Sequence, residues 1–250
     1  MTSDPADPAL SFGEVAAAYD AARPSFPADA LRWILGPNPL TVLDLGAGTG
    51  KLSARAVELG HGVIAVDPSR RMLDYARKIR GVQTMIGSAE AIPLGPASVD
   101  AVIAGQAFHW FEHDTALTEI ARVLKPGGTL GLLWNEYDTI VPWVRKFDSA
   151  VHGEEKAGKP YDPMPVLIRS HLLSITERAS FRHWNELDRG GLRLLAQSIS
   201  RVAVMPESQR LTVLAQVDDL YESTARPPEP VRMPYVTRCY RTHLRETVTP

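Results

Sequence analysis

Cysteine is nearly absent from this chain of 250 residues, which carries only Cys239. A single cysteine excludes an intramolecular disulfide and any metal site built from several cysteines. Long apolar runs are absent too, since none reaches the roughly 20 residues that a membrane-spanning helix needs. The start MTSDPADPAL is acidic and broken by proline, unlike a signal peptide. We therefore expect a cytoplasmic protein with no membrane partner.

An excess of charge of one sign is also absent. The formal net charge is −2, from 27 basic and 29 acidic residues, so no global basic field indicates a nucleic-acid partner. Hydrophobic residues make up 44% of the chain and charged residues 22%, which is ordinary for a soluble globular protein. A chain of this length can bury a sizeable core. No feature of the sequence bears on the oligomeric state.

Short apolar segments with strand character recur through the first half of the chain. Four of them have the near-continuous apolar character of parallel strands that are covered on both faces, and one is weaker. They are Thr41–Leu45, Gly62–Val66, Thr84–Gly87 (the weaker one), Val99–Gly105 and Thr129–Trp134. Segments with helical spacing of apolar residues separate them. Strand and helix alternating in this way predict an α/β fold with a doubly wound, mostly parallel sheet.

The second half of the chain is less regular. We expect residues 1–10 to be a disordered tail and residues 11–250 to be a single domain. Within that domain, N-terminal helices would occupy 11–40 and the ligand-binding core 41–135, while 136–250 would complete the sheet and supply substrate-side elements. The expected outer helices are Phe12–Tyr19, Ala28–Leu35, Trp143–Val151, Val166–Ser174, Arg189–Ile199 and Glu207–Glu222, and the expected late strands are Phe181–Glu186 and Val231–Tyr240.

Three glycines, Gly46, Gly48 and Gly50, lie between the strand Thr41–Leu45 and a helical stretch. Glycine lets the backbone turn sharply and lie against a ligand. A Gly-rich turn at this place is how α/β proteins hold nucleotide-like ligands, and its N–H groups favour a negative group. A plain tight turn would not need three glycines in five residues. The spacing is G-x-G-x-G, one residue shorter than the dinucleotide fingerprint G-x-G-x-x-G.

Asp67 follows the next strand, about 20 residues beyond the glycines, where an acid can accept both hydroxyls of a ribose. The alternative is a helix N-cap, because Asp67-Pro68 resembles a cap followed by proline at the first helical position. Both roles can coexist, since a carboxylate has two oxygens. Further along, Gly87-Ser88-Ala89-Glu90 would flank an adenine or form a surface turn.

The aromatic segment QAFHWF follows the strand Val99–Gly105. Three aromatic residues and a histidine are costly to expose at the end of a strand without a purpose. Phe108 and Phe111 fit packing into the core, whereas His109 is either a pocket residue or a structural histidine. His113 stands four residues further on, but no third ligand is identifiable, so no metal site is expected.

Together these segments resemble the class I S-adenosylmethionine-dependent methyltransferases. The resemblance runs from about Phe12 to Trp134, where VLDLGAGTG, AVDPS, GSAEAIPL, VDAVIAGQAFHWF and LKPGGTL occur in the order and spacing of that family. FGEVAAAYDAARPSFP, QAFHWF and LKPGG are similar to the small-molecule branch that includes trans-aconitate methyltransferase-like proteins. The resemblance implies S-adenosylmethionine as cofactor, a small-molecule methyl acceptor, and a Rossmann-like fold whose C-terminal helices lie over the site.

The resemblance also implies roles for individual residues. The loop of Gly46, Ala47, Gly48 and Gly50 would hold the methionine moiety, and Asp67 the ribose hydroxyls. The remaining cofactor positions would be Ser69, Met72, Ala89, Glu90 and Gln106. The residues that close over the methionine end or the acceptor would be Tyr19, Arg23 and Trp110, with helix packing and capping as the alternative for Tyr19 and Arg23.

The D/N-P-P-Y type motif of amino-group methyltransferases is absent after the fourth strand, where GQAFHW stands instead. Transfer to a DNA base or a glutamine nitrogen is therefore not expected. We expect transfer to an oxygen: a carboxylate bound by a cation such as Arg23, or a hydroxyl with His109 as base. The alternatives are a catalytically silent S-adenosylmethionine-binding module, and a nicotinamide dehydrogenase, whose G-x-G-x-x-G spacing and Tyr/Lys pair are not evident.

Overall fold

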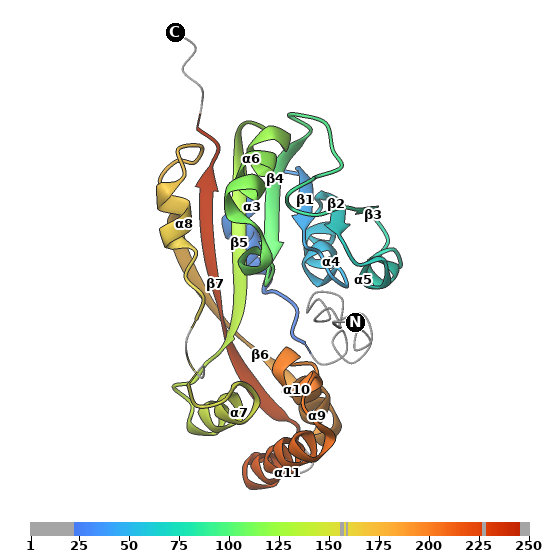
Figure 1. Cartoon of the computed structure of the whole chain (residues 1–250), viewed down its shortest axis with the longest axis vertical. Helices are drawn as coiled ribbons and strands as arrows, with labels where there is room; N and C mark the ends of the chain where they lie inside the picture. The colour runs from blue at the N-terminus through green and yellow to red at the C-terminus, as the bar shows by residue number, and fades with distance from the viewer. Residues whose placement is uncertain (1–22, 156–157, 159, 227–228, 246–250) are drawn as a thin grey trace, which may run out of the picture. The chain divides into compact units, whose positions relative to one another are not determined.

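The computed structural model describes residues 23–155, 158, 160–226 and 229–245 (Figure 1). Within these residues seven strands form one sheet in the order β3-β2-β1-β4-β5-β7-β6. Their bounds are β1 Thr41–Leu45, β2 Gly62–Asp67, β3 Val82–Ile86, β4 Val99–Gly105, β5 Leu124–Tyr137, β6 Glu177–Leu187 and β7 Val231–His243. Strands β1 to β5 pair in parallel. The predicted doubly wound, mostly parallel α/β sheet is confirmed.

Helices occupy the connections between these strands. They are α3 Ala28–Leu35, α4 Lys51–Glu58, α5 Arg70–Ala76, α6 His113–Val123, α7 Pro142–His152, α8 Met164–Arg169, α9 Arg189–Gln197, α10 Ser200–Ala203 and α11 Glu207–Thr224. A short 3₁₀ helix, Phe108–Trp110, follows β4. The predicted helix Phe12–Tyr19 and the predicted tail 1–10 lie outside the described residues.

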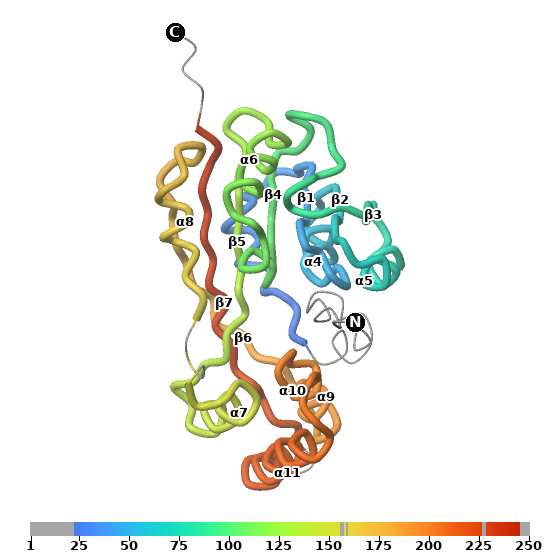
Figure 2. The backbone as a smooth tube through the Cα atoms, viewed as in Figure 1, coloured from blue at the N-terminus to red at the C-terminus, as the bar shows by residue number. Residues whose placement is uncertain are grey.

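The chain divides into two compact units. Unit 1 comprises residues 1–24, 136–160 and 182–236, and unit 2 comprises 25–135, 161–181 and 237–250. Strands β5, β6 and β7 contribute residues to both. Within unit 2, the C-terminal part of the chain lies beside β5: Figure 2 shows β7 along β5, and the N–H of Leu244 donates to the carbonyl of Gly128. Within unit 1, the N–H of Asp138 donates to the carbonyl of Pro234. Between these two bonds the residue numbers rise along β5 and fall along β7, so β7 runs antiparallel to β5.

Unit 2 buries both faces of its sheet, because side chains of a strand alternate between faces. On β1, Leu43 and Leu45 pack in one cluster with Ile120 of α6. Val42 belongs to another cluster, with Leu31 of α3 and residues of α4. All of these side chains are at most 3% exposed. Covered faces explain why the strand segments read as nearly continuous apolar runs.

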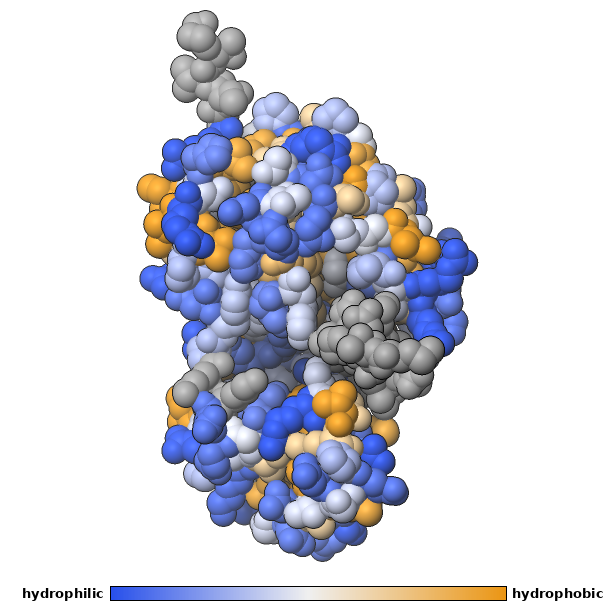
Figure 3. Space-filling view, viewed as in Figure 1, coloured by the Kyte–Doolittle hydropathy of each residue, from blue (hydrophilic) through white to orange (hydrophobic). Residues whose placement is uncertain are grey.

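Unit 1 has a separate hydrophobic core. It joins Phe147 of α7, Leu195 of α9 and Val217 of α11 with Met233 and Tyr235 of β7. On the face in Figure 3 hydrophilic residues predominate, and apolar residues appear as separate patches. Among the residues that the structure describes, no helix is both long and apolar enough to cross a membrane.

Two predicted elements differ from the structure for identifiable reasons. The helix expected over Val166–Ser174 ends at Arg169, because Leu173 forms a backbone bridge with Leu244 and its side chain is buried. The strand expected over Thr129–Trp134 is longer, since β5 begins at Leu124 and includes the LKPGG segment. Val99 pairs with Leu124 and Ala101 with Thr129, so a β-bulge-like register shift accommodates the extra residues.

Candidate active site

The turn after β1 is shaped by a close approach to the segment after β4. Gly46 has φ +70°, and a Cβ placed on it would lie 2.6 Å from the Cβ of Ala107. A side chain at this position would therefore collide with its neighbour. The N–H groups of Gly46 and Ala47 both donate to the carbonyl of Val66, at 2.8 and 3.1 Å. The ends of β1, β2 and β4 thus meet at one edge of unit 2.

Gly48 leaves the next part of the turn open. It has φ +57°, and no atom lies within 4 Å of the place where a Cβ would be. Its N–H donates to Oδ2 of Asp67 at 2.8 Å, and the N–H of Gly50 donates to the Ala47 carbonyl. The N–H groups of Gly46, Ala47, Gly48 and Gly50 all donate within the chain. A ligand would therefore contact the turn at the side-chain-free backbone of Gly48 and not through these four N–H groups.

Asp67, at the end of β2, is 8% exposed and holds two backbone N–H groups. Oδ1 accepts from Ser69 and Oδ2 from Gly48, both at 2.8 Å. Burial raises the pKa of Asp67, and the two N–H groups oppose this shift. Each carboxylate oxygen has a further lone pair, so Asp67 can still accept two hydroxyls. Its ribose role stays a prediction.

The N-cap interpretation of Asp67 is wrong. The N-cap of α5 is Ser69, whose Oγ accepts from the N–H of Met72 at 3.4 Å. Pro68 therefore precedes the helix instead of opening it. Ser69 and Met72 are nearly buried at the start of α5, so two of the predicted adenosine contacts lie beside the predicted ribose acceptor.

Asp44, two residues before Gly46, is a buried acid to which the sequence analysis assigned no role. It is 1% exposed, and Oδ2 accepts from the hydroxyl of Ser53 at 2.6 Å. Its Oδ1 has no hydrogen-bond partner among the described residues. Burial, helped by repulsion from Asp67 and opposed by Ser53, raises the pKa of Asp44 to about 7. The signal in the sequence was its position as the one acid in an apolar strand.

The loop between β3 and β4 carries Ala89 and Glu90. Ala89 is 4% exposed and packs in the core. Oε1 of Glu90 accepts from the N–H of Glu112 at 2.9 Å. Ala89 and Glu90 form a turn, as the alternative expected, but the side chain of Ala89 is buried.

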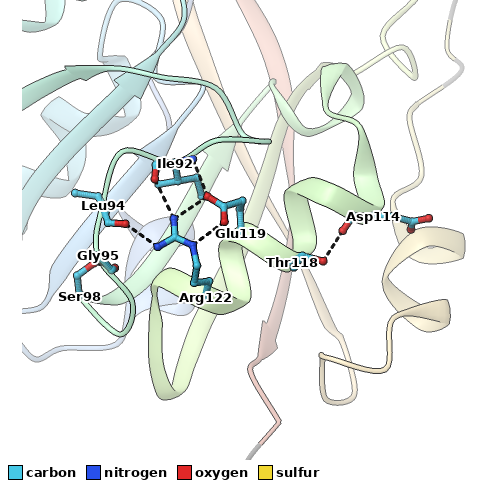
Figure 4. A network of polar contacts seen from close by, with 8 residues as sticks. All are labelled: Ile92, Leu94, Gly95, Ser98, Asp114, Thr118, Glu119 and Arg122. Atoms are coloured by element: carbon cyan, nitrogen blue, oxygen red, sulfur yellow. Dashed lines mark hydrogen bonds and ion pairs between the residues drawn. The ribbon is translucent and has the colours of Figure 1, made fainter.

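Helix α6 fixes the continuation of this loop (Figure 4). Arg122 donates to the carbonyls of Leu94 and Ile92 at 2.7 and 3.0 Å, and also pairs with Glu119 at 2.6 Å. Glu119 in turn accepts from the N–H of Ile92 at 2.9 Å. One ion pair thus satisfies three backbone groups of a segment that has no strand or helix of its own.

Gln106, directly after β4, has an unusual backbone conformation. Its φ of +58° lies in the left-handed region, which is rare for residues other than glycine. The conformation is held by two bonds: its N–H donates to the Leu133 carbonyl at 2.9 Å, and Nε2 donates to the Asn135 carbonyl at 2.8 Å. Backbone strain of this kind costs roughly 1–3 kcal/mol and concentrates at functional sites.

His109 lies on the 3₁₀ helix after β4, among aromatic rings. Trp134 Nε1 donates to His109 Nδ1 at 3.3 Å. The rings of Trp110 and Tyr161 lie 4.9 and 5.6 Å from the His109 ring, between centroids. Burial, with a smaller contribution from His113, lowers the pKa of His109. Trp110 is 53% exposed, so its large apolar surface borders this group of rings.

All predicted cofactor residues, together with His109 and Trp110, lie in unit 2. Arg23 lies in unit 1, where it contacts Ser198. Tyr19 is outside the described residues. In the part of the chain that the structure describes, no three or more His, Cys, Asp or Glu side chains group in a way that could hold a metal ion.

Residues 43–132 match the sequence model of a family described as a methyltransferase domain. A methyltransferase of Mycobacterium bovis is 38% identical over 248 residues, which cover 98% of this chain and 100% of that protein. This chain belongs to the methyltransferase family. It is an S-adenosylmethionine-dependent enzyme with the class I, Rossmann-like fold.

Two further comparisons extend this result. The solved structure of a type II methyltransferase from Anaeromyxobacter dehalogenans matches this methyltransferase with a TM-score of 0.67 and 23% identity, over 90% of this chain and 99% of that one. A malonyl-[acyl-carrier protein] O-methyltransferase of Methylococcus capsulatus is 40% identical over 133 residues, 48% of each protein. The first similarity concerns the fold, and the second covers only half of the chain.

The residues of this methyltransferase fit S-adenosylmethionine, whose ribose has two hydroxyls and whose methionine end carries cationic groups. Asp67 offers acceptors for the hydroxyls. The orphaned Oδ1 of Asp44 is a buried acceptor suited to a cationic donor, and two acids at this edge match a cationic ligand in sign. The open space over Gly48 leaves the backbone accessible to the ligand. Bound there, the cofactor supplies an electrophilic methyl group on a sulfonium sulfur.

Sequence reasoning did not identify the partners of His109 in this methyltransferase. Trp134 was recognised only as the end of a strand, and Tyr161 was not singled out at all. Parallel strand order predicts that the ends of β4 and β5 are neighbours, which is a usable signal for Trp134. No spacing rule connects Tyr161 to His109.

Proposed function

We propose that this methyltransferase transfers the methyl group to a carboxylate oxygen of a small organic acid. The observation that carries the proposal is the bond from Trp134 Nε1 to His109 Nδ1. An indole N–H can only donate, so Nδ1 must accept, and the proton of the neutral imidazole is then on Nε2. The ring therefore presents a donor at Nε2. A carboxylate needs no base because it is already an anion, whereas a hydroxyl acceptor needs one.

The surroundings of His109 support methyl transfer to such an acceptor. The rings of Trp110 and Tyr161 lie close to the imidazole, and Trp134 donates to it. Aromatic faces accommodate a cationic sulfonium. The relative that is named a malonyl-[acyl-carrier protein] O-methyltransferase, similar over half of the chain, adds support for oxygen as the target.

The chain's own contribution to the reaction is orientation. In-line displacement at a methyl carbon needs nucleophile, carbon and sulfur to be aligned, and fixed alignment of this kind can supply roughly 7–11 kcal/mol of the barrier. Asp67 and the turn at Gly48 would fix the position of the cofactor. The Gln106 backbone, held in its left-handed conformation, would fix the segment that follows β4. The Nε2–H of His109 would donate to the acceptor and hold it.

The proposal is tested by incubating the protein with methyl-labelled S-adenosylmethionine and a panel of organic acids, phenols and amines. We expect label on acids only. Label that appears on amines alone, or on phenols but never on acids, would contradict the proposal. Cofactor binding without label on any acceptor would favour the silent module instead.

A further inference from the structure

Unit 1 contains two neighbouring buried phenol hydroxyls that interact with each other and have no other hydrogen-bond partner among the described residues. They belong to Tyr137, the last residue of β5, and Tyr235 of β7 (Figure 1). Their ring centroids are 5.3 Å apart, and Tyr235 is only 3% exposed. Buried polar groups are nearly always hydrogen-bonded, and each exception calls for an explanation such as an absent ligand.

Other rings fix the two phenols in place. Tyr137 meets Phe147 of α7 edge to face at 5.4 Å, and His183 stacks on Tyr235 at 5.4 Å. Burial raises the pKa of Tyr137 to about 12 and that of Tyr235 well above its usual value. Both phenols therefore remain protonated near neutral pH and can donate a hydrogen bond.

A cation acts on both phenols. The positive charge of Arg23 lowers the pKa of Tyr137 and that of Tyr235, although burial outweighs it. Arg23 is oriented by Ser198, which is fully buried just after α9: Nε donates to Ser198 Oγ at 3.1 Å, and Nη2 to the Ser198 carbonyl at 3.3 Å. Arg23 is thus a cation of unit 1 whose charge acts on both phenols and whose guanidinium is oriented by Ser198.

One acidic side chain also affects the pKa of a phenol, and both of its carboxylate oxygens have hydrogen-bond partners. Asp148 of α7 raises the pKa of Tyr137. Its Oδ1 lies 2.7 Å from Nδ1 of His152, and its Oδ2 accepts from the N–H of Gly158 at 2.6 Å. Asp148 therefore has local partners of its own.

We propose that Tyr137, Tyr235 and Arg23 bind a carboxylate group of a small organic acid. Two O–H donors and a planar guanidinium match the two oxygens and the charge of a carboxylate. The ligand would satisfy both orphaned hydroxyls at once. The inference goes beyond the proposed function and does not depend on it. As an anion-binding site of unit 1 it stands on the contacts above.

The test is calorimetric binding of malonate and citrate to the cofactor-free full-length protein, with neutral malonamide and inorganic phosphate as comparisons. We expect Tyr137→Phe and Tyr235→Phe each to weaken carboxylate binding roughly tenfold or more, since a hydrogen bond to a charged group is lost. Arg23→Lys keeps the charge but loses the planar pair of donors, so it should also weaken binding. Tyr221→Phe, a matched change on α11 of the same unit, should leave binding unchanged.

A second measurement separates binding from folding. The hydroxyls of Tyr137 and Tyr235 interact only with each other among the described residues, so both Phe variants should unfold at close to the temperature of the ligand-free parent protein. The proposal is overturned if the parent binds neither acid, if phosphate or malonamide binds as well as malonate, if both Phe variants keep the parent affinity, or if they are destabilised without ligand. Because no methyl transfer is measured, acid binding without transfer to oxygen would refute the proposed function alone.

Discussion

Asp67 both organises the Gly-rich turn and is predicted to bind the ribose. We expect Asp67→Ala to weaken S-adenosylmethionine binding at least about tenfold, since a hydrogen bond to a charged group contributes roughly 1.5–3 kcal/mol. Part of the loss would come from the turn, because Asp67 holds the N–H groups of Gly48 and Ser69. Isothermal calorimetry measures the affinity. Asp74→Ala, which removes an exposed acid of α5, is the control, and unchanged affinity of Asp67→Ala would refute the ribose assignment.

Asp44 is predicted to make stability depend on pH. Its pKa is raised from 3.8 to about 7, so between these values the folded state holds a proton that the unfolded state has lost. Stability therefore falls as pH rises through this window, and the cost is complete above pH 7. It is at most roughly 4 kcal/mol, since one pKa unit corresponds to about 1.4 kcal/mol.

Asp44→Asn removes this titration. Relative to the parent protein, the free energy of unfolding of Asp44→Asn should therefore increase as pH rises from 4 to 8. Urea unfolding at several pH values measures this difference. Asp74→Asn should show no such trend. A difference between Asp44→Asn and the parent that is constant across the range would contradict the raised pKa.

His109 is predicted to orient the acceptor and not to remove a proton. In His109→Gln, the side-chain carbonyl can still accept from Trp134 and the amide can still donate. We expect kcat for an acid acceptor to stay within about fivefold of the parent, whereas loss of a general base costs roughly 10²–10⁴-fold. Steady-state kinetics distinguish these two outcomes. A hundredfold loss of kcat would contradict the orienting role and support His109 as the general base.

At the level of elements, the ion pair of α6 is predicted to hold the loop that carries Ala89 and Glu90. Arg122→Met keeps the apolar stem but leaves the carbonyls of Ile92 and Leu94 without this donor. We expect amide hydrogen exchange across residues 88–94 to become roughly tenfold faster, the equivalent of about one lost hydrogen bond. Arg32→Met, at an exposed pair on α3, is the control. Unchanged exchange would show that the loop is held by packing alone.

The elements that the sequence predicted best are those whose burial pattern is local. Thr41–Leu45 and Val99–Gly105 have the predicted bounds, because strands covered on both faces are apolar throughout. The poorest predictions depended on distant partners. Residues 170–174 continue the helical spacing of apolar residues, but the bridge between Leu173 and Leu244 decides their conformation.

The same distinction applies to the site. The turn residues and Asp67 could be predicted as candidates because their spacing is set by one strand–turn–helix unit. The Trp134–His109 bond joins two strand ends, and its consequence for the proton on His109 follows only from geometry. The pair of Tyr137 and Tyr235 joins positions almost a hundred residues apart in the sequence, and nothing but the fold brings them together.

At the level of the whole molecule, the two units divide the predicted tasks. The residues predicted to bind the cofactor lie in unit 2, and the proposed carboxylate site lies in unit 1. Unit 1 has its own core, built from α7, α9, α11 and β7.

The most direct test of this account is the bond that the transferred methyl group forms. The product made from ¹³C-methyl S-adenosylmethionine and an organic acid is isolated and examined by carbon NMR before and after mild alkali. We predict a methyl ester, whose label is released as methanol by alkali. Label that stays on the product after alkali, attached to carbon or nitrogen, would contradict transfer to a carboxylate oxygen.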